Sequence, residues 1–135
     1  MNMHKLISHA LLALLFALGI SHAPHASAEG AIISQSEIDA EIVRRIYLGQ
    51  SRQFIAANLP EGSDARNTFE NSFVGRSPDQ MKAHWSRLLF TGRAVELRVL
   101  ETDEQVLEFV RSNPNTVGYI SDATKASGLN VIATF

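Results

Sequence analysis

The stretch QFIAANLPEGSDARNTFENSFV, residues 53–74, decides the fold because it predicts a strand, a tight loop and a helix in succession. The mostly apolar run 53–59 is typical of a short strand, and a proline ends it. A helix is expected over 63–74, where Phe69 and Phe73 are four residues apart and share one face. A strand that leads directly into a helix is the unit from which α/β domains are built.

Two more helices are predicted by capping signals. Ser34 with Glu37 has the spacing of a reciprocal cap, and it predicts a helix that Gly49 ends in a left-handed turn. Ser77 with Gln80 has the same spacing, and a proline stands at the first helical position. Both segments then carry apolar residues at helical spacing, as expected of helices with one buried face.

The rest of the chain continues the alternation of strands and helices. Apolar and charged residues alternate over 95–100, which predicts a half-buried strand. Thr102 with Gln105 then predicts a fourth helix that must end before the next proline. Two β-branched or aromatic strands are expected over 116–121 and 129–135. We therefore expect an α/β fold, a single small domain with about four helices and three to four strands.

The first residues predict export. Lys5 provides a basic start, residues 6–20 are almost entirely apolar, and 26–28 read Ala-Ser-Ala, a small-residue cleavage signal. We expect a cleaved signal peptide over 1–28 and a periplasmic domain over 29–135. An uncleaved membrane anchor is the competing interpretation. It is disfavoured because polar residues and a proline interrupt the apolar run before the ~20 residues that a membrane span requires.

Composition excludes several classes of function. The net charge of −2 does not fit a protein that binds nucleic acid through a broad basic surface. The chain has no cysteine, which excludes disulfides and thiolate metal sites. Four of the five histidines lie in the predicted signal and leave only His84, so we expect no histidine-rich metal site and no cofactor.

Candidate catalytic groups are few. His84 lies in the middle of a predicted helix, without the strand-turn-helix elbow that a hydrolase serine would need, and is interpreted as a histidine at the edge of the core. Asp103 and Glu104 fall in the first turn of the fourth helix, where negative side chains favourably meet the helix dipole. The sequence has neither the nucleotide-hydrolase phosphate loop nor a dinucleotide fingerprint. We therefore do not expect an enzyme.

One loop has the properties of an anion site. Gly62, Ser63, Asp64, Ala65 and Arg66 enter the second helix, where unpaired backbone N–H groups and the helix dipole attract negative charge. The serine hydroxyl and the arginine guanidinium would add two further donors. The alternative interpretation is that the serine only caps the helix and the arginine is solvated, since caps are far commoner than ligand sites.

The order of several motifs resembles a known family. The matching segments are Arg45-Ile46-Tyr47-Leu48-Gly49, Gly62-Ser63 with Arg66 and Phe69, Val74-Gly75-Arg76-Ser77, Trp85 with Phe90-Thr91-Gly92, and Asn113-Pro114 before Val117-Gly118-Tyr119-Ile120. In this order they resemble the small phosphate ABC transporter substrate-binding-like proteins, which share the type II periplasmic binding protein fold.

The resemblance implies one lobe of such a fold, with phosphate or a similar oxyanion as ligand and an inner-membrane ABC permease as partner. It also implies that the loop 62–66 faces the anion, and that a homodimer or a pairing with another protein would complete the cleft. Leu59 stands where the phosphate binders have an arginine, and Asp64-Ala65 replaces their Gly-Thr. The second hypothesis is therefore a non-catalytic accessory domain of the cell envelope that has lost its ligand.

Overall fold

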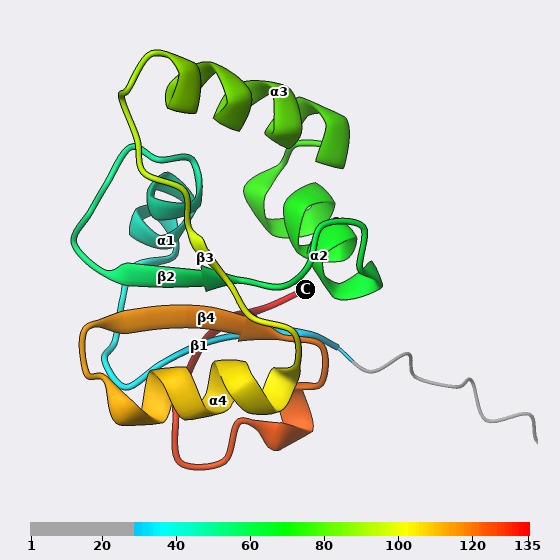
Figure 1. Cartoon of the computed structure of the whole chain (residues 1–135). Coiled ribbons are helices and arrows are strands. Elements are labelled where there is room, and N and C mark those ends of the chain that lie inside the picture. Colours follow the sequence, from blue (N-terminus) through cyan, green and yellow to red (C-terminus); the bar gives the residue numbers. More distant parts are fainter. Residues whose placement is uncertain (1–28) are drawn as a thin grey trace, which may run out of the picture.

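The computed structural model describes residues 29–135, so the predicted signal peptide over 1–28 lies outside the described residues. The described chain forms a small α/β domain (Figure 1). Its elements are β1 (Ala31–Ser34), α1 (Ala40–Tyr47), β2 (Ile55–Asn58), α2 (Asp64–Phe69), a π-helix (Glu70–Val74), α3 (Pro78–Phe90), β3 (Arg98–Val99), α4 (Asp103–Ser112), β4 (Thr116–Ile120), a 3-10 turn (Ala123–Lys125) and β5 (Asn130–Thr134).

The five strands form one mixed sheet in the order β3-β2-β4-β1-β5. The three strands β3, β2 and β4 are parallel to one another, whereas β1 runs antiparallel to both β4 and β5. The α/β class and the four α-helices agree with the sequence analysis, and the described sheet has one strand more than the three to four expected.

Helices cover both faces of the sheet, and β4 shows why. Successive residues of a strand point to opposite faces. Tyr119 stacks on Phe69 of α2 with ring centroids 3.9 Å apart. Its neighbour Gly118 faces α4, where an added Cβ would lie 2.6 Å from a methyl group of Val106. The glycine is therefore what allows α4 to pack closely against the sheet.

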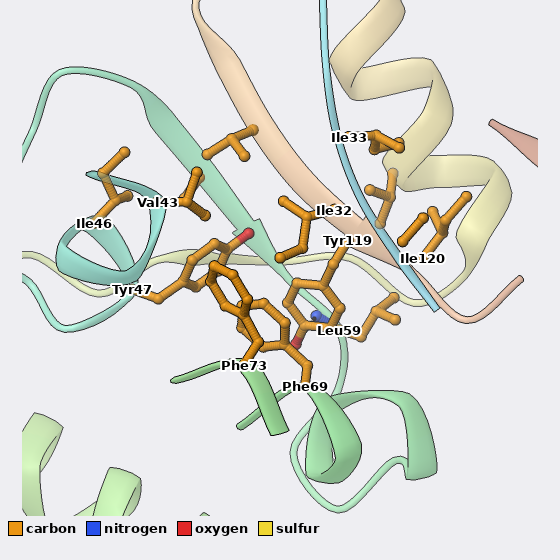
Figure 2. Packing of buried hydrophobic residues seen from close by; sticks show 14 of the residues in the cluster. Ile32, Ile33, Val43, Ile46, Tyr47, Leu59, Phe69, Phe73, Tyr119 and Ile120 are labelled. Carbon is orange, nitrogen blue, oxygen red and sulfur yellow. Dashed lines mark hydrogen bonds between the residues drawn. The ribbon is translucent and has the colours of Figure 1, made fainter. Parts of the chain in front are cut away.

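An aromatic cluster fills the core on the α1 and α2 side (Figure 2). Tyr119 lies at its centre, in edge contact with Tyr47 at 5.7 Å and stacked on Phe69. The Tyr119 hydroxyl donates a hydrogen bond to Oδ1 of Asn58 at 2.8 Å and accepts one from the backbone N–H of Leu59 at 3.1 Å. The Tyr119 side chain of β4 therefore contacts both the Phe69 ring of α2 and the end of β2.

The expected start of the first helix is wrong. Ser34 is the last residue of β1, fully buried, and its hydroxyl donates to the carbonyl of Thr116 in β4 at 2.8 Å. The helix begins at Ala40, where Asp39 caps it by accepting from the N–H of Glu41. The run 31–34 is buried on both faces as an inner strand, so it lacks the alternation that would have revealed it.

The expected strand over 95–100 is only partly formed. It is reduced to the two residues Arg98 and Val99 of β3, an edge strand paired on one side to β2. Val95 and Val99, which the alternation placed inward, are 76% and 44% exposed. Tertiary packing decides here: Val99 lines a cavity opposite α3 and is not covered by that helix.

Two other helix predictions are confirmed. Ser77 accepts from the N–H of Gln80, whose side chain accepts from the N–H of Ser77, which is the complete capping box. The helix expected over 63–74 is continuous but changes from α to π geometry at Glu70. None of the helices in residues 29–135 combines the length and apolar character needed to span a bilayer.

Replacing Tyr119 with Phe tests the role of the hydroxyl. The variant leaves the N–H of Leu59 and the side-chain oxygen of Asn58 without this partner while keeping the aromatic packing. We expect a loss of about 2 to 4 kcal/mol in the free energy of unfolding, measured by urea denaturation. Tyr47→Phe is the matched control. It removes a single hydrogen bond, to the carbonyl of Ala57, and should cost less. Equal losses would contradict the central role of Tyr119.

Candidate functional site

The carboxyl ends of β2, β3 and β4 meet at one edge of the sheet because the three strands are parallel. The loops that leave them carry residues 59–63, 100–102 and 121–122. The first two loops lead directly into the N-termini of α2 and α4. Ligand sites of open α/β sheets are found at such edges, so the candidate site is placed here by topology.

The loop before α2 is a tight turn. The N–H of Ser63 donates to the carbonyl of Pro60 at 3.1 Å, and Gly62 has a φ of +82° with open space around it. The Ser63 side chain caps α2 by accepting from the N–H of Arg66 at 3.4 Å. Serine capping is thus present in the structure, while the first-turn N–H groups of residues 64 and 65 have no intrahelical acceptor.

A cavity of about 370 Å³ lies between this loop and the start of α4. Ser63 and Ala65 line it, together with Lys125 from the 3-10 turn. Of the other residues predicted for the site, Gly62 in the turn and Asp64 at the start of α2 are both exposed. The structure therefore brings two of the five predicted residues to one cavity.

The fifth predicted residue, Arg66, faces a different cavity on the other side of α2. Its Nη1 donates to the carbonyl of Leu59 at 3.1 Å, and its Nε lies 3.5 Å from a carboxylate oxygen of Glu70. Both side chains are largely buried, with exposed fractions of 16% and 5%. In this conformation the guanidinium is held by the protein and turned away from Ser63.

Leu59 explains part of this arrangement. It is 4% exposed and belongs to the core cluster, so an apolar side chain occupies the position where the resemblance placed an arginine. Its backbone is used at both ends, because its N–H donates to Tyr119 and its carbonyl accepts from Arg66. The backbone of Leu59 holds the loop in place, and its apolar side chain contributes no positive charge to this region.

Carboxylates dominate the cavity at Ser63. Glu101, Asp103 and Glu104 line it, against the single ammonium group of Lys125. Asp103 is nearly buried and accepts from both the N–H and the hydroxyl of Ser121, at 2.8 and 2.7 Å. Asp103 thus accepts the hydrogen bonds of both Ser121 donors in the loop after β4.

Lys125 links the carboxylates of α4. Its Nζ lies 3.0 Å from Glu104 and 3.5 Å from Asp103. The hydrogen bond from Lys125 lowers the pKa of the Glu104 carboxyl, and the same bond raises the pKa of the Lys125 ammonium. Sequence reasoning missed Lys125 and Ser121 as members of the cavity. It assigned Asp103 to the helix dipole alone, because Asp103 and Lys125 are 40 and 62 positions from Ser63 in the sequence, too far for a local pattern to show that they meet.

Comparisons with known proteins bear on the fold. No family model matches the sequence, and a comparison with curated proteins finds no match. Among solved structures, the crystal structure of an ABC-type phosphate transport receptor from Vibrio cholerae matches with a TM-score of 0.53 and 18% sequence identity. The fold is similar to that of a periplasmic binding protein. The match covers 77% of this chain and 45% of the receptor, so the chain spans less than half the receptor's length.

Burial raises the proton affinity of the Glu70 carboxyl group. Desolvation raises the pKa of its carboxyl, and the neighbouring Arg66 offsets only part of that effect. A carboxyl whose pKa is higher in the folded state than in the unfolded state stabilises the fold below the unfolded pKa. That contribution is lost as the pH rises through the folded pKa.

The variant Glu70→Gln tests this pH dependence. We expect the difference in unfolding free energy, wild type minus variant, to decrease as the pH rises from about 4 to about 7, because only the wild type has a titrating carboxyl at position 70. Urea denaturation at several pH values measures the difference. Glu108→Gln, on the exposed surface of α4, is the control for the loss of a carboxylate that is not buried. A difference that increases with pH would contradict the assignment.

Proposed function

We propose that the protein is a non-catalytic, solute-binding-like component of a transport system, which binds phosphate or a similar oxyanion in the cavity at Ser63. Residues 1–28 would export it to the periplasm, and an inner-membrane ABC permease would be its partner. The observation that carries the proposal is the cavity itself, since it lies at the carboxyl edge of the parallel strands, in a fold similar to a phosphate transport receptor.

Three kinds of donor support an oxyanion at this place. The first-turn N–H groups of α2 and the hydroxyl of Ser63 lie at one side of the cavity, and the ammonium group of Lys125 lines it as well. Backbone N–H groups together with one cation are a common way to hold a tetrahedral anion. Arg66 would join them only after giving up its contacts with Leu59 and Glu70.

The surrounding carboxylates set the expected strength. Glu101, Asp103 and Glu104 place three negative charges around a cavity that holds one positive charge. Each would repel a phosphate, most strongly where water is partly excluded. We therefore expect weak binding, with a dissociation constant of about a millimolar, equivalent to about 4 kcal/mol of binding free energy.

Asp103 favours a second candidate function, an accessory domain of the cell envelope that has kept the fold and lost the ligand. A carboxylate that already accepts from the N–H and hydroxyl of Ser121 satisfies those donors within the protein. The chain also spans less than half of the transport receptor, so a second lobe is not part of the match. Titration with phosphate separates the two candidates.

Calorimetric titration of the purified protein with phosphate is the first test. We expect saturable heat that weakens about tenfold or more in Ser63→Ala and in Lys125→Gln, because each loses a hydrogen bond to a charged group. Lys82→Gln is the matched control: it removes the same charge from an exposed position outside the cavity and should bind like wild type. The absence of heat at phosphate concentrations up to tens of millimolar would contradict the binding proposal and favour the accessory domain.

The variant Asp103→Asn provides a test in the opposite direction. It removes one negative charge from the cavity. The hydrogen bonds from Ser121 become weaker, although the amide oxygen of the asparagine can still accept them. We expect phosphate to bind about tenfold more tightly than to wild type in the same titration. Unchanged or weaker phosphate binding in a folded variant would show that Asp103 does not oppose the anion.

A further inference from the structure

A second cavity lies on the opposite side of Arg66, between α3 and the edge formed by β2 and β3. Its volume is about 190 Å³. Met81, Trp85 and Leu89 of α3 provide an apolar wall, and Leu97 and Val99 close the other side. An apolar cavity of about 150 Å³ accepts a benzene ring, so this one has room for a ring with a short tail.

Glu70 supplies a carboxylate to this cavity from the π-helix. Its side chain is 5% exposed, and within the described residues its polar contact is Arg66 Nε at 3.5 Å, the far limit of a hydrogen bond. The same Nε is a buried donor without a hydrogen-bond partner in the described chain. A buried carboxylate is stable only when donors satisfy it, and here the protein satisfies it incompletely.

The charges around the cavity favour a cation. Three carboxylates line it, from Glu61, Glu70 and Glu96, whereas Arg66 and Lys82 supply two positive charges. Lys82 lies on the exposed rim, where it pairs with Glu61 at 3.3 Å. The buried part of the cavity therefore contains the Glu70 carboxylate with one imperfectly placed guanidinium.

Trp85 is held in a fixed position on the apolar wall. Its indole N–H donates to the carbonyl of Tyr47 at the end of α1, at a distance of 3.0 Å. A tryptophan ring attracts cations as well as apolar groups. Because it is the single tryptophan of the chain, its fluorescence reports directly on this cavity.

We propose that this second cavity binds a small organic amine, with its ammonium group on the Glu70 carboxylate and its apolar body against Met81, Trp85 and Leu89. The ammonium provides the hydrogen-bond donors that Glu70 lacks, and its charge matches the carboxylates of the lining. The inference does not depend on phosphate binding, because Ser63 and Lys125 belong to the other cavity.

Titration of the purified protein with 2-phenylethylamine at neutral pH, followed by Trp85 fluorescence, tests the proposal. We expect a saturable change, and binding at least about tenfold weaker for 2-phenylethanol, which has the same ring and tail without the charge. Phosphate at millimolar concentration should not compete beyond its effect as a salt. Equal responses to the amine and the alcohol would overturn the proposal.

Two variants identify the residues involved. Glu70→Gln should weaken amine binding at least about tenfold, whereas Glu108→Gln on α4 should bind like wild type. Leu89→Lys changes a residue that is 41% exposed at the mouth of the cavity, so it leaves the buried pair in place. It should also weaken binding about tenfold, through repulsion of the ammonium and competition for Glu70. Wild-type affinity in both Glu70→Gln and Leu89→Lys would refute the site.

Discussion

The hydroxyl of Tyr119 joins the elements that surround the two candidate cavities. It connects β4 to the last residue of β2 and to the N–H of Leu59, while the tyrosine ring stacks on Phe69 of α2. One side chain therefore fixes the start of the loop before α2 and packs on the last residue of that helix. Both cavities border this loop and helix, so their shapes depend on a buried hydrogen-bond network whose partners would be costly to leave unpaired.

The carboxylate of Glu70 is buried at the point where the helix changes from α to π geometry. Phe69 is the last residue of α2 and Glu70 is the first of the π-helix, and both are buried, together with Phe73 and Val74. The aromatic cluster and the carboxylate therefore lie on the inner side of the same continuous helix. Single π turns are often found at functional sites, which is consistent with a cavity lined by Glu70.

Local signals predicted much of this fold, and non-local packing decided the rest. The capping box at Ser77, the helix over 63–74 and the strand before it were readable because caps and periodicity act within a few residues. The strand β1 was missed because it is buried on both faces and carries a serine that imitates a helix cap. At the site, Ser63 was found as a helix cap, but the conformation of Arg66 depends on Glu70 and Leu59, and Lys125 comes from a distant turn.

The two cavities differ less in the net charge of their linings than in the burial of the groups that would bind a ligand. Carboxylates outnumber cations in both, so neither lining is electrostatically suited to a phosphate without help from backbone N–H groups. At the Ser63 cavity such groups lie at the starts of α2 and α4. The cavity at Glu70 has instead an apolar wall and a desolvated carboxylate, and desolvation strengthens the attraction of that carboxylate for an ammonium group. One short helix thus presents backbone donors at its start and a buried acceptor at its π turn, so a single domain can offer opposite chemistry on the two sides of Arg66.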